Sequence, residues 1–161
     1  RSAVPGTTHS SGHPGKRLGL VQNHLLELLP ERDRTRLLAA CETVQLKLGQ
    51  VLDEAGCAIR HVYFPTEGSI SLVSRVDEHP GLEVGMVGRE GMVGTALLLG
   101  VPYSPARALV QGAGASWRIS AAAFRIELKA STALQRQLSL YLYVLMAQTV
   151  SSAGCLRFLP A

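Results

Sequence analysis

The chain has 161 residues, of which 47% are hydrophobic and 17% are charged. This length suits one domain with a hydrophobic core, and this composition excludes a disordered chain. The net charge of +4 comes from 16 Lys and Arg against 12 Asp and Glu. These charges are scattered along the chain, so the sequence does not predict a nucleic-acid-binding face.

The N-terminal residues are predicted to lie outside the fold. Residues 1–17, "RSAVPGTTHSSGHPGKR", are rich in Ser, Gly, Pro and Thr and lack apolar periodicity, which predicts a flexible tail. We expect one domain over residues 18–161. Two short helices come first, with Asn23 suited to cap the first and Pro30 suited to the first position of the second.

The apolar residues then change from a helical to an alternating pattern. Short segments rich in β-forming residues follow each other as far as Ser120, and turns that contain glycine separate them. This spacing predicts an antiparallel sandwich or jelly roll. The segments are "VLDEAG", "IRHVYFP", "SISLVSRV", "LEVGMVG", "ARALVQ" and "SWRIS", after an alternation at Val44, Leu46 and Leu48.

Two helices are predicted after the strands. Ser120 is suited to cap the first, and Ser131 or Thr132 begins a long helix over about residues 132–153. The long helix is apolar nearly all round, so it needs burial on two sides, against its own domain and against a second chain. We therefore expect a homodimer. The stripe expected at the interface is Leu134, Leu138, Tyr141, Leu142, Leu145 and Thr149.

The sequence contains no pattern for a membrane span or for secretion. The most apolar stretch, "LSLYLYVLMA" at 138–147, is about half the length that a membrane span requires. The N-terminus does not show the basic, apolar and small-residue order of a signal peptide. We expect a cytoplasmic protein with no membrane partner.

Metal-binding and catalytic motifs are also missing. Cys41, Cys57 and Cys155 form no C-x-x-C pair, and the five histidines form no H-x-H pair, so no metal site is predicted. The chain lacks the G-x-S-x-G motif of serine hydrolases, and its carboxylates, such as Asp53 and Glu54, fall in predicted turns. The sequence therefore does not predict an enzyme.

A glycine-rich stretch at 85–100, "GMVGREGMVGTALLLG", has the composition of a phosphate cradle. It lacks the Lys of a P-loop and is not a G-x-G-x-x-G fingerprint. By themselves, these glycines indicate the ends of strands and turns.

Several segments, in their order, resemble the sensor domain of Crp–Fnr bacterial transcription regulators. They are "LKLGQVL", "AGCAIRHVYFPTEGSISLV", "VGREGMVG" and "ALVQGAGASWRIS", and the match runs from about Leu25 to Phe158. The resemblance implies a mainly β fold with flanking helices: a jelly roll (double-stranded β-helix) of the cyclic-nucleotide-binding type, with N-terminal helices and a long C-terminal dimerisation helix. It implies DNA contact only through a helix-turn-helix that this chain, which stops at Ala161, does not contain.

The resemblance also implies where an effector binds. The candidate pocket residues are Gly94, Thr95 and Ala96 from the glycine-rich stretch and Ala106, Arg107 and Ala108 from a later strand. In members that bind cyclic AMP, a Glu contacts the ribose and an Arg contacts the phosphate. Here Thr95 stands at the Glu position and Ala106 at the Arg position. Arg107 is displaced by one residue, so it should point away from the pocket unless a bulge shifts the strand.

We therefore expect an effector-sensing and dimerising domain whose pocket is altered away from cyclic AMP, with an unknown small-molecule effector and no bound cofactor. Two alternatives stay open. The domain binds a cyclic nucleotide through Arg107, or its pocket is closed and it serves only to dimerise.

Overall fold

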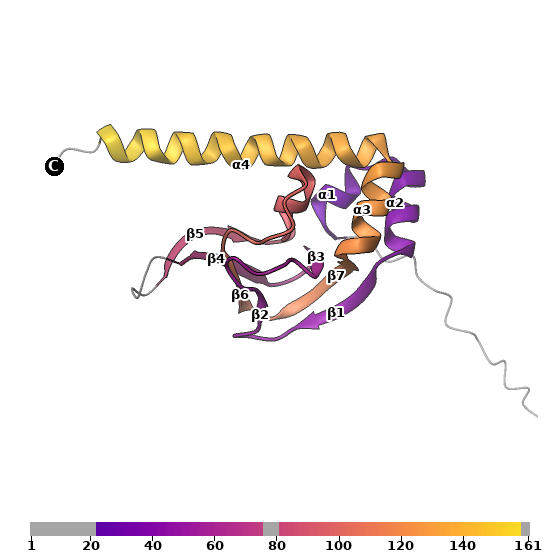
Figure 1. Ribbon diagram of the computed structural model, residues 1–161, viewed down its shortest axis with the longest axis horizontal. Helices are drawn as coiled ribbons and strands as arrows, with labels where there is room; N and C mark the ends of the chain where they lie inside the picture. The colour runs from indigo at the N-terminus through magenta and orange to yellow at the C-terminus, as the bar shows by residue number, and fades with distance from the viewer. Residues whose placement is uncertain (1–21, 76–80, 159–161) are drawn as a thin grey trace, which may run out of the picture.

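The computed structural model describes residues 22–75 and 81–158, with side chains as far as Ser151. The predicted tail at 1–17 lies outside the described residues, as do residues 18–21 of the predicted domain. Two stacked sheets lie beneath a long C-terminal helix, with three shorter helices at one end (Figure 1).

The first two helices are α1 (His24–Glu27) and α2 (Glu31–Ala39). Asn23 is the N-cap of α1, as predicted, because its Oδ1 accepts hydrogen bonds from the backbone N–H groups of Leu25 and Leu26 at 3.1 and 3.3 Å. Its Nδ2 donates to the carbonyl oxygens of Pro65 and Gly91, which joins α1 to the sheets. Pro30 directly precedes α2 instead of occupying its first turn.

In the described part of the chain, seven strands form two antiparallel sheets. One sheet has the order β1-β7-β3 and the other β2-β6-β4-β5, which agrees with the predicted jelly roll. The strands are β1 (Glu42–Leu46), β2 (Val51–Asp53), β3 (His61–Pro65), β4 (Ser69–Ser74), β5 (Leu82–Val87), β6 (Arg107–Gly112) and β7 (Gly114–Ser120).

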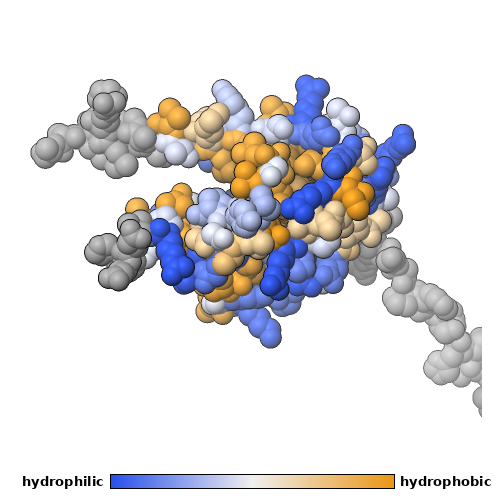
Figure 2. Space-filling view, in the orientation of Figure 1, coloured by the Kyte–Doolittle hydropathy of each residue, from blue (hydrophilic) through white to orange (hydrophobic). Residues whose placement is uncertain are grey.

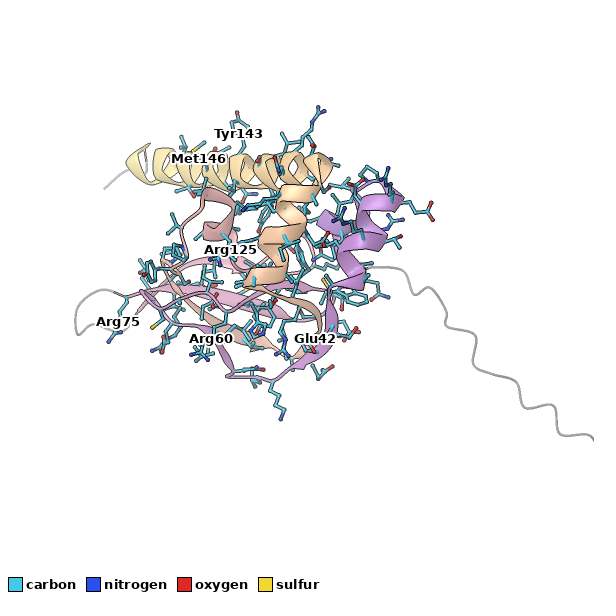
Figure 3. All side chains as sticks on the ribbon, turned by 45° about the vertical axis from the view of Figure 1, so that its right-hand side comes forward. Glu42, Arg60, Arg75, Arg125, Tyr143 and Met146 are labelled. Carbon is cyan, nitrogen blue, oxygen red and sulfur yellow. The ribbon has the colours of Figure 1, made fainter. Side chains whose placement is uncertain are left out.

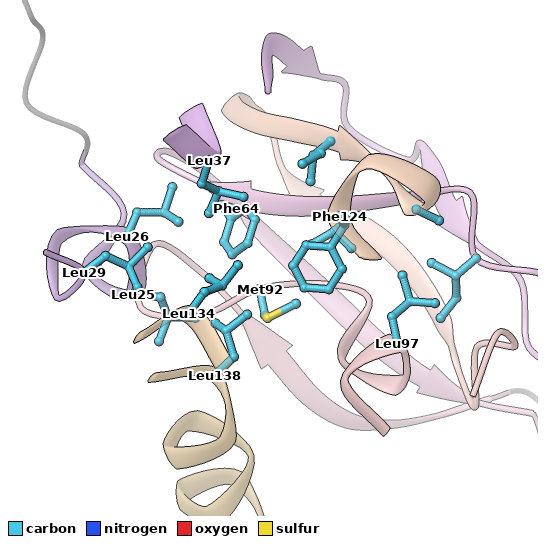
Figure 4. Packing of buried hydrophobic residues seen from close by; sticks show 14 residues of the cluster. Leu25, Leu26, Leu29, Leu37, Phe64, Met92, Leu97, Phe124, Leu134 and Leu138 are labelled. Atoms are coloured by element: carbon cyan, nitrogen blue, oxygen red, sulfur yellow. The ribbon is translucent and has the colours of Figure 1, made fainter. Parts of the chain in front are cut away.

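The core has two parts because β3 alternates its side chains between two layers. Val62 and Phe64 pack with the helices, whereas Tyr63 packs between the sheets with residues such as Ile70 and Val110. Figure 4 shows the helical part of the core, where Phe124 lies among apolar side chains from all four helices and the sheet.

Two helices follow the strands, α3 (Ala121–Ala130) and α4 (Thr132–Phe158), and a short 3₁₀ helix, η1 (Thr95–Leu99), precedes β6. Ser120 caps α3 as predicted, since its Oγ accepts from the N–H of Ala123 at 3.2 Å. Ser131 lies directly before α4 and caps it: its Oγ accepts from the N–H of Leu134 at 3.0 Å and donates to Asp33 at 2.6 Å.

The structure corrects the predicted dimer stripe on α4. Leu134 and Leu138 are each 1% exposed in the single chain, where they pack against α1, α3 and the loop that contains Met92 (Figure 4). They have no surface left to offer a second chain. Of the other predicted stripe residues, Thr149 is exposed and the rest are partly buried, so their place at an interface stays a prediction.

Candidate functional site

A cavity of about 410 Å³ lies between the sheets and α4. Its walls come from the ends of β2 and β5, the loop before η1, the segment before β6, and the middle of α4. The alternative of a closed pocket is therefore not supported. The lining residues include Asp53, Val87, Met92–Ala96, Ser104–Ala106, Tyr141, Leu145, Gln148 and Thr149.

The glycine-rich loop shapes one wall of the cavity through its backbone. Glu90 is a turn carboxylate, because its Oε1 accepts from the N–H of Gly88 at 2.9 Å. Gly94 has φ = +105°, a conformation that side chains other than glycine rarely adopt, and a Cβ there would lie 3.1 Å from Val62. A Cβ at Gly91 would collide with the hydroxyl of Tyr141. These glycines allow the loop to approach β3 and α4 closely.

The structure brings four of the six predicted ligand-binding residues to the cavity: Gly94, Thr95, Ala96 and Ala106. Ala108 is 1% exposed and packs in the core between the sheets instead. Ala106 and Ala108 share one face of the strand, as alternation requires.

Arg107 does not belong to the cavity, which corrects its place among the predicted ligand-binding residues. Its Nε and one terminal nitrogen donate to the two carboxylate oxygens of Glu54 at 2.6 and 3.1 Å, on the outer face of the sheet. Arg107 pairs with Val73 and the adjacent Ala108 with Leu72, without a bulge between the two pairs. The displacement by one residue therefore turns the guanidinium away, and the motive for cyclic-nucleotide binding through Arg107 is lost.

Asp53 is a cavity residue that the sequence did not predict. Asp53 lines the cavity and is only 7% exposed, and burial raises the pKa of its carboxyl group to about 6. It forms no hydrogen bond or ion pair with any residue that the structure describes. The sequence predicts a turn at Asp53. The structure places it in β2, which is only three residues long and whose pairing with β6 shifts between Val51 and Asp53, so the sequence shows no strand alternation there.

Tyr141 joins α4 to the glycine-rich loop at the cavity wall. Its hydroxyl forms a hydrogen bond with the backbone of Met92, and burial raises its pKa, with the charge of Glu90 acting in the same direction. Tyr141, Leu145 and Thr149, which were predicted at a dimer interface, thus line the cavity. Leu142 beside them is half-buried.

Within residues 22–75 and 81–158, no group of three or more His, Cys, Asp and Glu side chains is placed to hold a metal ion. No helix in the same ranges has the length and hydropathy needed to cross a membrane.

No protein-family model and no curated protein matches this sequence. Solved structures do match its fold. The c-di-GMP responsive global regulator CLP of Xanthomonas campestris has a TM-score of 0.69 and 18% identity, over 81% of this chain and 66% of that one. The catabolite activator protein of Thermus thermophilus has a TM-score of 0.68 and 13% identity, over 84% of this chain and 64% of that one.

A third match is the sensor domain of the transcriptional regulator DNR from Pseudomonas aeruginosa, with a TM-score of 0.61 and 21% identity, over 80% of this chain and 87% of that one. The structural neighbours are Crp–Fnr regulators and cyclic-nucleotide-binding domains, which confirms the predicted fold. This chain spans about two thirds of the length of CLP and of the catabolite activator protein.

The fold does not determine the ligand. Among the neighbours are a regulator described as c-di-GMP responsive, a Toxoplasma gondii kinase regulatory domain crystallised with cAMP, and the regulatory subunit of a cAMP-independent kinase from Trypanosoma brucei. The chemistry of this cavity must therefore be inferred from its own residues.

Proposed function

We propose that this chain is the effector-sensing and dimerising domain of a cytoplasmic Crp–Fnr-type transcription regulator, with a pocket altered away from cyclic AMP. It acts by binding and not by catalysis, and DNA contact belongs to a helix-turn-helix outside this chain. The fold and its structural neighbours support the regulatory class. The altered pocket is supported by Ala106 and Thr95, which stand where members that bind cyclic AMP have an Arg and a Glu.

One observation carries this proposal: one face of α4 lines the cavity and the opposite face is exposed. Tyr141 and Leu145 on one face line the cavity, whereas Tyr143 and Met146 on the other face are 63% and 60% exposed. Figure 3 shows Tyr143 and Met146 on the side of α4 that faces away from the sheets. A ligand in the cavity would contact the helix whose opposite side is free to pair.

The outer face of α4 has the pattern of a helix that pairs with another helix. Leu140, Tyr143, Ala147 and Val150 recur at spacings of three and four residues, which is the repeat of a two-helix seam. Three of them are large apolar residues exposed by 50 to 67%. Figure 2 shows apolar residues gathered along α4. This outer face, and not the predicted stripe, is where we place the second copy.

The test is the oligomeric state of the full chain. Tyr143→Glu places a charge in the centre of the proposed seam and should convert a dimer into a folded monomer, measured by sedimentation velocity. Ile126→Glu is the matched control, because Ile126 is also 63% exposed but lies on α3. It should leave the dimer intact. A wild-type chain that stays monomeric at high micromolar concentration, or a Tyr143→Glu variant that stays dimeric, would reject this function.

A further inference from the structure

The cavity holds a carboxylate that has no partner. Asp53 is more than nine-tenths buried, and no residue that the structure describes donates a hydrogen bond to it or pairs with its charge. The carboxylate is not sealed in the core: among the described residues the buried side-chain polar atom without a partner is Ser71 Oγ, and no oxygen of Asp53 is of that kind. Its charge therefore opens onto the cavity, where the described protein residues leave it unpaired. A partner supplied by a ligand would account for this residue.

The protein groups around the cavity do not supply that partner. None of its described lining residues is a Lys, Arg or His. The hydroxyl of Ser104 donates to the carbonyl oxygen of Ala106 at 2.7 Å, and that of Thr149 donates to Leu145 at 3.0 Å. These two donors are therefore already engaged within the protein.

The electrostatics of the cavity favour a cation over an anion. Glu90 adds a second negative charge close enough to act on Tyr141 at the cavity wall. Two arginines lie near the candidate site in the sequence, and neither lines the cavity. Arg89 lies in the turn beside Glu90, and Arg107 is held by Glu54 on the other side of the sheet. An anionic ligand would meet a carboxylate and no countercharge from the described lining.

The rest of the cavity suits a small apolar body. Its size falls within the range of small-molecule sites, at about 300–1,000 Å³. Apolar side chains come from each side, among them Ile59, Val87, Met92 and Leu145. Burial of an apolar body among them would supply the affinity, and the single carboxylate would orient the ligand.

We propose that this cavity binds a small organic amine, with its ammonium group paired to Asp53 and its apolar body between the sheets and α4. This inference rests on the proposed sensing function and names the chemical class of the effector. It also gives the charge of Asp53 a partner inside the cavity.

The test uses three probes with the same apolar body: 3-phenylpropylamine, 3-phenylpropanol and 3-phenylpropionate. Each is titrated into the ¹⁵N-labelled full chain, and the amide shifts of Thr95, Ala96 and Ala106 report on the cavity. The amine should bind about tenfold more tightly than the carboxylate, since only the amine makes a charge-assisted pair. Asp53→Asn should lower the amine affinity by about tenfold and change the alcohol affinity by less than about twofold.

The matched control is Glu54→Gln. It removes the same charge at the next residue, but on the outer face of the sheet, so it should leave the amine affinity unchanged. The melting temperature of each variant establishes that it is folded. Equal or tighter binding of the carboxylate, an unchanged amine affinity in Asp53→Asn, or no amine shift at the cavity would overturn the inference. The oligomeric state of the wild type and of Tyr143→Glu is measured without any amine, so it does not depend on these titrations. Failure of amine binding can therefore be distinguished from failure of the proposed dimer.

Discussion

At the scale of single residues, the direction of two side chains underlies our proposal that this pocket is altered away from cyclic AMP. Arg107 points outward to Glu54, and Asp53 points inward without a partner. The outward direction of Arg107 follows from strand alternation and was predictable from the sequence. The burial of Asp53 was not, because it depends on a register shift between β2 and β6 that no local pattern encodes.

Asp53 should make stability depend on pH. Burial raises its pKa from 3.8 to about 6, so the folded state binds a proton more tightly than the unfolded state does. The resulting stability is fully present below pH 3.8 and is lost as the pH rises through about 6. Asp53→Asn should therefore be more stable than the wild type at pH 7, by about 1–3 kcal/mol, and this advantage should shrink at pH 4–5.

The measurement is urea denaturation of both proteins between pH 4 and pH 8. Other ionisable groups lie near Asp53. The charge of Asp53 raises the pKa of Tyr63, whose hydroxyl is hydrogen-bonded with Arg118, and Arg118 also forms an ion pair with Glu42. The difference between wild type and variant isolates Asp53 from them. A difference that stays constant over this pH range would contradict the raised pKa.

Arg107 should have no part in nucleotide binding. We expect cyclic AMP or cyclic GMP at about 1 mM to leave the melting temperature of the chain unchanged within a degree, because binding that is weak at this concentration adds almost no stability. Arg107→Ala should give the same result by differential scanning fluorimetry. A rise of several degrees in the wild type that disappears in Arg107→Ala would show that the guanidinium does reach the ligand.

At the scale of elements, α4 shows what an apolar pattern can and cannot predict. The sequence correctly predicts a long helix that begins at Ser131 or Thr132, because the cap and the helical spacing are local. The helix ends at Phe158, beyond the predicted end at about residue 153. It does not predict which face meets the domain, because α4 is apolar nearly all round. The burial of Leu134 and Leu138 in the core determines which positions of α4 are exposed.

The two faces of α4 should respond differently to the same substitution. Leu138→Ala removes a side chain that is 1% exposed and should lower the free energy of unfolding by about 2–4 kcal/mol. Leu140→Ala removes one that is 50% exposed and should cost less than about 1 kcal/mol in the dilute monomer, while it weakens the dimer. Denaturation at low protein concentration, with sedimentation at high concentration, separates the two effects. Equal losses of stability would contradict this assignment of faces.

At the scale of the whole molecule, the arrangement of strands and helices was predictable because its turns are marked by glycine and its strands are short and evenly spaced. The cavity was only partly predictable. The sequence predicts the lining residues Gly94 to Ala96, which are neighbours in the chain. It does not predict Asp53 or Tyr141 as lining residues, because they come from distant segments that only the fold brings to the cavity.

The same arrangement predicts a coupling between the cavity and the dimer. Because α4 contributes to both, a ligand that orders Tyr141 and Leu145 should change how readily Tyr143 on the outer face pairs with a second chain, and pairing should change ligand affinity by the same factor.

The most direct test is the dimer dissociation constant of the full chain, measured by sedimentation equilibrium with and without saturating 3-phenylpropylamine. We predict a change of about fivefold or more, the lower end of typical coupling between two sites, and no change in Asp53→Asn. A dissociation constant that is the same with and without saturating amine would contradict the claim that α4 connects sensing to pairing.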